Sequence, residues 1–266
     1  MTVLNTPIDT TVRLAFDDTG RRDGPAVVLL HGLTFDRTTW APIVERIAGR
    51  YRVITFDLPA HGETGGIPAS NFLIACQVHT QLDELGVASP VVVGHSMSGT
   101  IAALYGAHFP VAGIVSVDQV PDIRPLVPLA SSMTRSLSAA EFAAAFAPMQ
   151  ASMHLEELPT ASRLLVEEAQ ARNARPATVF GYWDQLLGGD VDDLQAAIDN
   201  DLRRITAPML AVFGHHLDEG ERAFLETRIT ADLEIVELDG AGHFVHLARP
   251  AEFVETLTTF IDRPGG

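Results

Sequence analysis

The sequence predicts an α/β fold in which a mainly parallel sheet is flanked by helices and carries an inserted helical segment. Short apolar runs typical of buried parallel strands recur along the chain, and helical stretches separate most of them. The alternation stops between about residues 120 and 205, where alanine-, leucine- and glutamate-rich runs replace strands. The predicted strands lie near residues 11–16, 26–30, 52–56, 90–93, 113–117, 208–213 and 233–238, and the first is expected to be an antiparallel edge strand.

This break in the alternation predicts two structural units. Residues 1–119 and 206–266 are expected to form the core, and residues 120–205 a helical cap. An insertion between the two halves of a parallel sheet lies over the carboxyl ends of the strands, where ligands bind in open α/β sheets. Cap helices are predicted after a capping box formed by Ser138 and Glu141, and over residues 160–173 and 191–202.

Composition narrows the possible partners. The 266 residues include 47% hydrophobic residues, enough for a sizeable core, and carry a net charge of −16. Such a charge disfavours binding to nucleic acids and anionic membranes, so we expect a small, neutral substrate. The single cysteine, Cys76, excludes an internal disulfide, and neither a signal peptide nor a long apolar run is present. We therefore expect a cytoplasmic protein. A homodimer is compatible with the sequence, which does not define the oligomeric state.

The segment around Ser96 has the pattern of a nucleophile elbow. Three valines at residues 91–93 lead into Gly94, His95, Ser96, Met97 and Ser98, and a helix-forming run follows. A serine hydroxyl is a weak nucleophile, and a sharp strand-to-helix turn exposes it beside a base and backbone N–H donors. Small residues fit where the turn brings its backbones together. The pattern therefore predicts Ser96 as the nucleophile, with serine in the fifth position where glycine is usual.

Two further segments supply the remaining parts of such a site. The apolar run at residues 26–30 ends in His31 and Gly32, a turn that would aim the N–H of Leu33 at Ser96. Together with the N–H of Met97, it would form an oxyanion hole. His31 itself is expected to brace the turn. Near the C-terminus, His243 lies on a glycine-rich loop after a predicted strand, which favours it as the general base over the other nine histidines, His246 included.

On these residues the chain resembles the α/β-hydrolases over nearly its whole length. The resemblance rests on the turn at residues 31–33, the elbow at Ser96, and the G-H-F-x-H-L segment at residues 242–247. Residues 56–64 also resemble the family's structural turn D-x-x-G-H-G-x-S, with Ala60 in place of its first glycine. The resemblance implies an α/β-hydrolase fold with a serine, histidine and acid triad.

The acid of the triad has two candidates. The commoner family position, three residues after Gly214, is Leu217 here, and Asp218 follows one residue later. Asp118 follows the strand after the elbow helix, a placement that resembles haloalkane dehalogenases and cofactor-free ring-cleaving dioxygenases. The acid must accept a hydrogen bond from the Nδ1–H of His243. We favour Asp118, because its strand neighbours the nucleophile strand, and keep Asp218 as the alternative.

Aromatic residues of the predicted cap are candidates for substrate contact. Phe180, Tyr182 and Trp183 form the densest aromatic cluster, and we expect them to contact substrate together with Leu33 and Met97. A cap of this kind excludes water and favours a modest apolar substrate. Most other apolar cap residues are expected to pack the cap helices together. They include Phe142, Phe146, Met149, Met153 and Leu165.

No cofactor or metal is expected. His215 and His216 are adjacent on a predicted loop, and neighbouring histidines seldom converge on one ion. Cys76 lacks an adjacent base, so it is not expected to act as a nucleophile. The sequence contains no dinucleotide or phosphate loop.

The motifs together predict a serine carboxylic ester hydrolase of Ser96, Asp118 and His243. The serine at the elbow argues against dehalogenase and typical epoxide hydrolase activity, since those family members carry aspartate there. Lactones, thioesters, peracid formation and C–C bond cleavage use the same machinery and stay open. Two alternatives belong to other classes: a cofactor-independent oxygenase that uses the histidine and aspartate as a base, and a non-catalytic ligand receptor.

Overall fold

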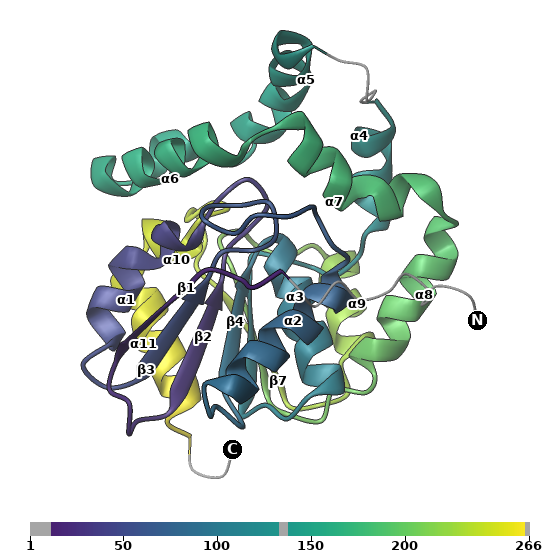
Figure 1. Ribbon diagram of the computed structural model, residues 1–266. Helices are drawn as coiled ribbons and strands as arrows, with labels where there is room; N and C mark the ends of the chain where they lie inside the picture. Colours follow the sequence, from purple (N-terminus) through teal and green to yellow (C-terminus); the bar gives the residue numbers. More distant parts are fainter. Residues whose placement is uncertain (1–11, 133–137, 264–266) are drawn as a thin grey trace.

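The computed structural model describes residues 12–132 and 138–263 (Figure 1). Within these residues, seven strands form one sheet in the order β1-β3-β2-β4-β5-β6-β7. Strand β1 runs antiparallel to β3, and the other pairings are parallel. This arrangement confirms the predicted α/β fold class. The strands are β1 (Phe16–Gly20), β2 (Ala26–Leu30), β3 (Arg52–Phe56), β4 (Val91–His95), β5 (Gly113–Val117), β6 (Met209–Phe213) and β7 (Leu233–Glu237).

The first strand lies later in the chain than predicted. We expected it near residues 11–16, of which residue 11 lies outside the described residues, but β1 begins only at Phe16. The backbone N–H groups just before β1 bond to side chains from other elements. The N–H of Leu14 donates to Gln81 Oε1 at 2.7 Å, and the N–H of Ala15 donates to Thr64 Oγ1 at 2.8 Å. These backbone groups are therefore not used in the sheet ladder. The strand is an antiparallel edge strand, as predicted.

Helices cover both faces of the sheet (Figure 1). Alternate residues of a strand point to opposite faces, so Val92 joins the core cluster on one face while Val91 and Val93 join the cluster on the other. Helices α1 (Ala41–Ile47) and α11 (Pro250–Ile261) bury apolar residues in the Val93 cluster. The Val92 cluster is covered by α2 (Asn71–Glu84), α3 (Met97–His108) and α9 (Glu219–Arg228).

The described part of the segment between β5 and β6 contains helices joined by loops and no strand. Helices α6 (Thr160–Asn173) and α8 (Val191–Leu202) have the predicted bounds, and the capping box of Ser138 and Glu141 opens α5 (Ala139–Ala151). Figure 1 shows α4 (Val127–Ser132), α5, α6 and α7 (Pro176–Gly188) across one end of the sheet. Helix α8 instead packs against α3, and its Ile198 and Leu202 are buried in the Val92 cluster.

The helices α6 and α7 lie over the carboxyl ends of the strands. The hydroxyl of Tyr182 donates a hydrogen bond to the carbonyl of Pro59, in the turn after β3, at 2.9 Å. Asn173 accepts from the N–H of Gly62 in the same turn and donates to Asp36, after β2. No helix in the described part of the chain is long and apolar enough to cross a membrane. The remaining short elements are α10 (Val245–Ala248) and the 3-10 helices η1 (Arg37–Trp40), η2 (Arg124–Leu126) and η3 (Leu155–Glu157).

Candidate active site

Ser96 occupies a strained turn between β4 and α3. Its φ of 54° and ψ of −130° lie outside the backbone regions that residues other than glycine favour. The turn brings backbones into close contact, because a Cβ added at Gly94 would lie 1.8 Å from the carbonyl oxygen of Ser98. Gly99 is as restricted, since its Cβ would lie 2.5 Å from Ser116 Oγ. The local geometry is that of the predicted elbow.

Ser98, in the position where glycine is usual, is buried and bonded. Its Oγ donates a hydrogen bond to the carbonyl oxygen of His31, at the end of β2. This bond joins the turn that carries Ser96 to the turn that carries Leu33. The serine thus links the two segments that the sequence assigned to the site.

His243 and Asp118 are paired directly. The Nδ1 of His243 lies 2.7 Å from Asp118 Oδ2, and Asp118 Oδ1 accepts a hydrogen bond from the N–H of Gly214 at 3.1 Å. The ring of His215 approaches the same carboxylate, with Nδ1 at 3.4 Å from Oδ1. Burial by itself raises the pKa of Asp118, but the hydrogen bonds from His215 and His243 hold that pKa well below its usual range. The carboxylate is therefore ionised and faces the histidine.

Asp218 serves a different purpose. It is the N-cap of α9, where its side chain accepts from the N–H of Glu221 at 2.8 Å and the Glu221 side chain bonds back to the N–H of Asp218. This reciprocal capping box satisfies two backbone donors at the start of the helix. The structure therefore brings Asp118, and not Asp218, to His243.

The two residues of the predicted oxyanion hole, Leu33 and Met97, lie on turns that meet at Ser96. Met97 is the first residue of α3, where backbone N–H groups have no acceptor within the helix. Leu33 follows Gly32, and a Cβ added at Gly32 would lie 3.1 Å from Ser96 Cβ. Among the described residues, the N–H of Leu33 donates no hydrogen bond within the protein. The residues predicted to supply the oxyanion hole therefore both adjoin Ser96.

Two buried histidines fix the turn that carries Leu33. His31 Nδ1 donates to the carbonyl of Gly32 at 2.8 Å, and its Nε2 accepts from the N–H of Leu58 at 3.0 Å, so His31 braces the turn as predicted. His61 Nε2 accepts from the N–H of Thr34 at 3.1 Å. Burial lowers the pKa of His31 to about 4 and that of His61 to about 3, so both rings are neutral at pH 7.

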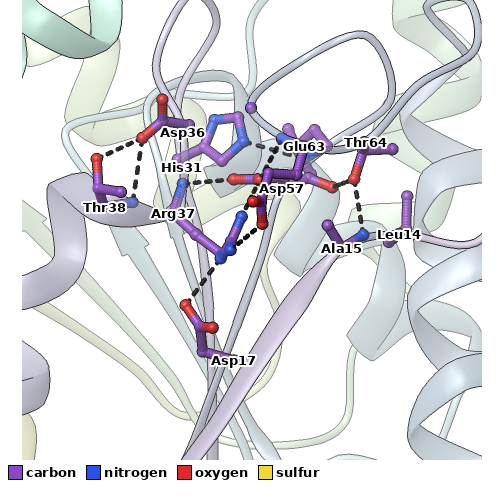
Figure 2. A network of polar contacts seen from close by, with 12 residues as sticks. Leu14, Ala15, Asp17, His31, Asp36, Arg37, Thr38, Asp57, Glu63 and Thr64 are labelled. Carbon is purple, nitrogen blue, oxygen red and sulfur yellow. Dashed lines mark hydrogen bonds and ion pairs between the residues drawn. The ribbon is translucent and has the colours of Figure 1, made fainter.

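A polar network surrounds these turns (Figure 2). Asp57, which follows β3, accepts hydrogen bonds from the backbone N–H groups of Arg37 and Glu63 and pairs with the Arg37 guanidinium. Arg37 also reaches Asp17 on the edge strand at 2.8 Å. The segment at residues 56–64 is therefore a structural turn, in agreement with the expectation from the family resemblance.

The three aromatic residues expected to contact substrate are all buried, in two environments. Phe180 and Trp183 pack in a cluster with Phe142 and Phe146, and Leu33 packs against that cluster. Tyr182 is turned toward the turn after β3, where its hydroxyl bonds Pro59. Phe180 and Trp183 thus belong to the apolar cluster that packs against Leu33, while the hydroxyl of Tyr182 is already hydrogen-bonded within the protein.

Sequence reasoning assigned no contact to His95 or His215, although both touch the candidate site. His95 Nε2 lies 2.9 Å from the carbonyl oxygen of His243. His215 faces Asp118 from the loop after β6, at the edge of a groove of about 700 Å³ that is also lined by Phe224 and Arg228. The one signal for His95 was its place beside Ser96. The sequence drew attention to His215 only as a neighbour of His216, because only the folded loop brings it to Asp118.

Two groups of histidines have the residue types of a metal site: the adjacent pair His215 and His216, and an exposed cluster that includes His154. His215 faces Asp118 and Glu221, whereas His216 faces Glu237 and Asp239, so the adjacent pair diverges. On the surface, one potential ligand atom from each of three exposed residues lies within 4.8 Å of the others; these residues are His154, Glu156 and Glu157. His246 is fully buried, stacked on Trp40 with ring centroids 4.3 Å apart, and neither of its nitrogens has a hydrogen-bond partner among the described residues.

Comparison with known proteins agrees with this fold. A model of the Alpha/beta hydrolase family matches residues 27–256, so the chain belongs to that family and is an α/β hydrolase enzyme. It is 25% identical over 264 residues to the 2-(acetamidomethylene)succinate hydrolase of Mesorhizobium japonicum, covering 94% of this chain and 92% of that protein. The enol-lactonase of Burkholderia xenovorans LB400 has a similar structure, with a TM-score of 0.73 at 20% identity over 94% of this chain and 96% of that chain.

A further relative matches only in part. The chain is 33% identical over 108 residues to the magnesium-chelatase 30 kDa subunit of Rhodobacter capsulatus. That match covers 40% of this chain and spans 38% of the relative's length. It therefore adds support for the shared fold rather than for a shared activity.

Proposed function

We propose that the protein is a serine hydrolase that cleaves a small, neutral, apolar carboxylic ester or lactone through an acyl-enzyme. The observation that carries the proposal is the 2.7 Å contact between His243 Nδ1 and the buried Asp118 carboxylate, next to a strained serine turn. An ionised acid on Nδ1 fixes the tautomer that leaves Nε2 free to accept a proton. The histidine is then a base for the Ser96 hydroxyl.

Each step has a group to perform it. Ser96 Oγ attacks the carbonyl carbon and its proton passes to His243 Nε2, while the N–H groups of Leu33 and Met97 bind the oxyanion. The proton then passes from His243 to the leaving alkoxide as the C–O bond breaks. Water, deprotonated by His243, attacks the acyl-enzyme, and Ser96 leaves with the proton as the acid is released. Each oxyanion donor typically contributes about 3–4 kcal/mol to lowering the barrier.

The surroundings support a neutral and apolar substrate. The aromatic cluster of Phe142, Phe146, Phe180 and Trp183 contacts Leu33, and the net charge of the chain is −16. Apolar walls with a few fixed polar groups are typical of small-molecule sites. The helices α6 and α7, bonded to the turns beside the site, would cover the substrate as a cap.

Intact-mass labelling with a fluorophosphonate tests the nucleophile. We expect one adduct on the native protein and none on Ser96→Ala, followed by turnover of members of an ester and lactone panel by the native protein alone. A folded native protein that forms no adduct would overturn the serine mechanism. In that case, oxygen uptake with a phenol- or quinolone-like substrate, unchanged in Ser96→Ala, would identify an oxygenase. No turnover of the esters, the lactones or these oxygenase substrates would favour a ligand receptor.

A further inference from the structure

His95 connects the nucleophile strand to the loop of the catalytic base. It is the last residue of β4, directly before Ser96, and only 2% of its surface is exposed. Its Nε2 lies 2.9 Å from the backbone carbonyl oxygen of His243, a residue 148 positions away in the chain. A carbonyl oxygen only accepts hydrogen bonds, so the ring donates its Nε2 proton in this contact.

Packed rings hold His95 in this orientation. The ring centroid of His95 lies 4.9 Å from that of Phe244, 4.7 Å from that of His246, and 6.2 Å from that of Phe35. Burial and the nearby His246 and His243 rings keep the pKa of His95 well below its usual value, so the ring is neutral and carries a single N–H. The contact with the His243 carbonyl places that N–H at Nε2.

The loop that carries His243 is already tied to the end of β6, because the N–H groups of Ala241 and Gly242 donate to the carbonyl of Gly214 at 3.1 and 3.2 Å. Gly240 and Gly242 precede His243 with φ angles of 72° and 63°, a conformation that glycine adopts without strain. Asp118 holds the imidazole at Nδ1, but a ring held at one atom still moves with its backbone. The bond from His95 to the carbonyl of His243 adds a tie to the nucleophile strand β4, one residue away from Ser96 in the chain.

We propose that His95 is a positioning residue that fixes the backbone of His243 relative to Ser96, and so sets the distance over which the proton passes between them. The expected effect on the rate rests on the proposed function, whereas the anchoring of the loop by His95 is independent of it. Displacing a reacting group by about 1 Å costs on the order of 100-fold in rate, whereas substrate affinity depends on other contacts.

Two variants separate the donor from the packing. His95→Gln keeps an amide N–H within reach of the Nε2 position, while His95→Phe keeps a ring and removes the donor. We expect His95→Phe to lower kcat by about 10- to 100-fold with KM within about twofold of the native value, and His95→Gln to recover most of the loss. Thermal melts and circular dichroism establish that both variants are folded, and His95→Asn, too short to reach the carbonyl, replaces His95→Phe if that variant does not fold.

Hydrogen–deuterium exchange tests the anchor without any substrate. Peptides covering residues 239–246 should exchange faster in His95→Phe than in the native protein and His95→Gln, while peptides from β2 stay unchanged. Equal kcat values and equal exchange in the two variants would overturn the proposal. If the native protein is neither labelled by fluorophosphonate nor active, the proposed function fails, but the exchange comparison still decides whether His95 anchors the loop.

Discussion

Asp118 accepts a hydrogen bond from His243 across 2.7 Å although 125 residues separate them in the chain. The carboxylate stands at the end of β5, beside β4, and its own φ of 52° is unusual for a residue other than glycine. The same carboxylate is also approached by Gly214 and His215 from the loop after β6. One buried acid therefore joins three segments around the candidate base.

Replacing the two candidate acids separately should give opposite results. Asp118→Asn keeps the shape but presents an amide to His243 Nδ1, which favours the wrong tautomer, so kcat should fall by about 10⁴-fold. Asp218→Asn should leave kcat within about twofold, because asparagine caps a helix as well as aspartate does. Steady-state kinetics on one ester measures both. Comparable small losses from the two substitutions would contradict the Asp118 assignment.

Ser98 should contribute to stability through its bond to His31. Ser98→Ala leaves the buried carbonyl of His31 without this donor, and we expect a loss of about 1 kcal/mol in the free energy of unfolding. Denaturant titration measures it. Ser132→Ala is a suitable control, since Ser132 makes a similar side-chain bond to a backbone carbonyl on an exposed helix and should change stability by less than about 0.5 kcal/mol. Equal effects at both positions would show that the link between the two turns is unimportant.

His215 should shift the pH dependence of hydrolysis. Its pKa is raised by the hydrogen bond to Asp118, against the opposing effect of burial, and Glu221 and Asp118 both face the ring. A protonated His215 beside Asp118 opposes the arrival of a second positive charge on His243. His215→Gln removes that cation, so the acid limb of kcat/KM should move to higher pH. A pH profile from 5 to 9 would contradict this expectation if the limb stayed in place or moved to lower pH.

His246 should make the folded protein sensitive to acid. Burial lowers its pKa to about 3, whereas the unfolded chain takes up a proton near the ordinary histidine pKa of about 6.5. Between these values the unfolded state binds more protons, so stability falls as the pH falls, by up to about 1.4 kcal/mol per pH unit for one such residue. His246→Phe keeps a ring against Trp40 without the nitrogens, and should be more stable than the native protein at pH 5.

Thermal melts of the two proteins at pH 7.5, 6 and 5 check this expectation. The difference in melting temperature between His246→Phe and the native protein should widen as the pH falls. A constant difference across the three conditions would show that His246 is not held neutral in the folded state. His31 and His61, also buried with lowered pKa values, add to the slope of the native protein but are common to both proteins.

The sequence was sufficient for the strands of the sheet that are buried on both faces. Residues 26–30 form a continuous apolar run, residues 52–56 and 113–117 are mostly apolar, and β2, β3 and β5 have those same bounds. The edge strand β1 was misplaced because its start depends on Gln81 and Thr64, which bond Leu14 and Ala15 from other elements. Helix α7 was not predicted either, and no side-chain cap marks its start.

Some residues of the candidate site could likewise be recognised from the sequence, and others only from the folded chain. Gly94 and Ser96 were recognisable because a tight turn demands small residues at fixed spacing, and the chain order of Ser96 and His243 followed from the strands around them. The choice between Asp118 and Asp218 required three dimensions, since only the folded chain shows that Asp218 caps α9 while Asp118 faces His243. The contacts of His95 and His215 likewise arise between segments distant in sequence.

The bond from Tyr182 to Pro59 has a consequence for changing the specificity of this protein. Pro59 also accepts from His61 Nδ1 at 3.0 Å, and His61 Nε2 accepts from Thr34, next to the donor residue Leu33. A directed-evolution library that randomises α7 to change the proposed substrate contacts would therefore disturb the turn of Leu33, a proposed oxyanion donor, whenever it includes Tyr182. Libraries that hold Tyr182 fixed and vary Phe180 and Trp183 would separate the choice of substrate from the rate of its turnover.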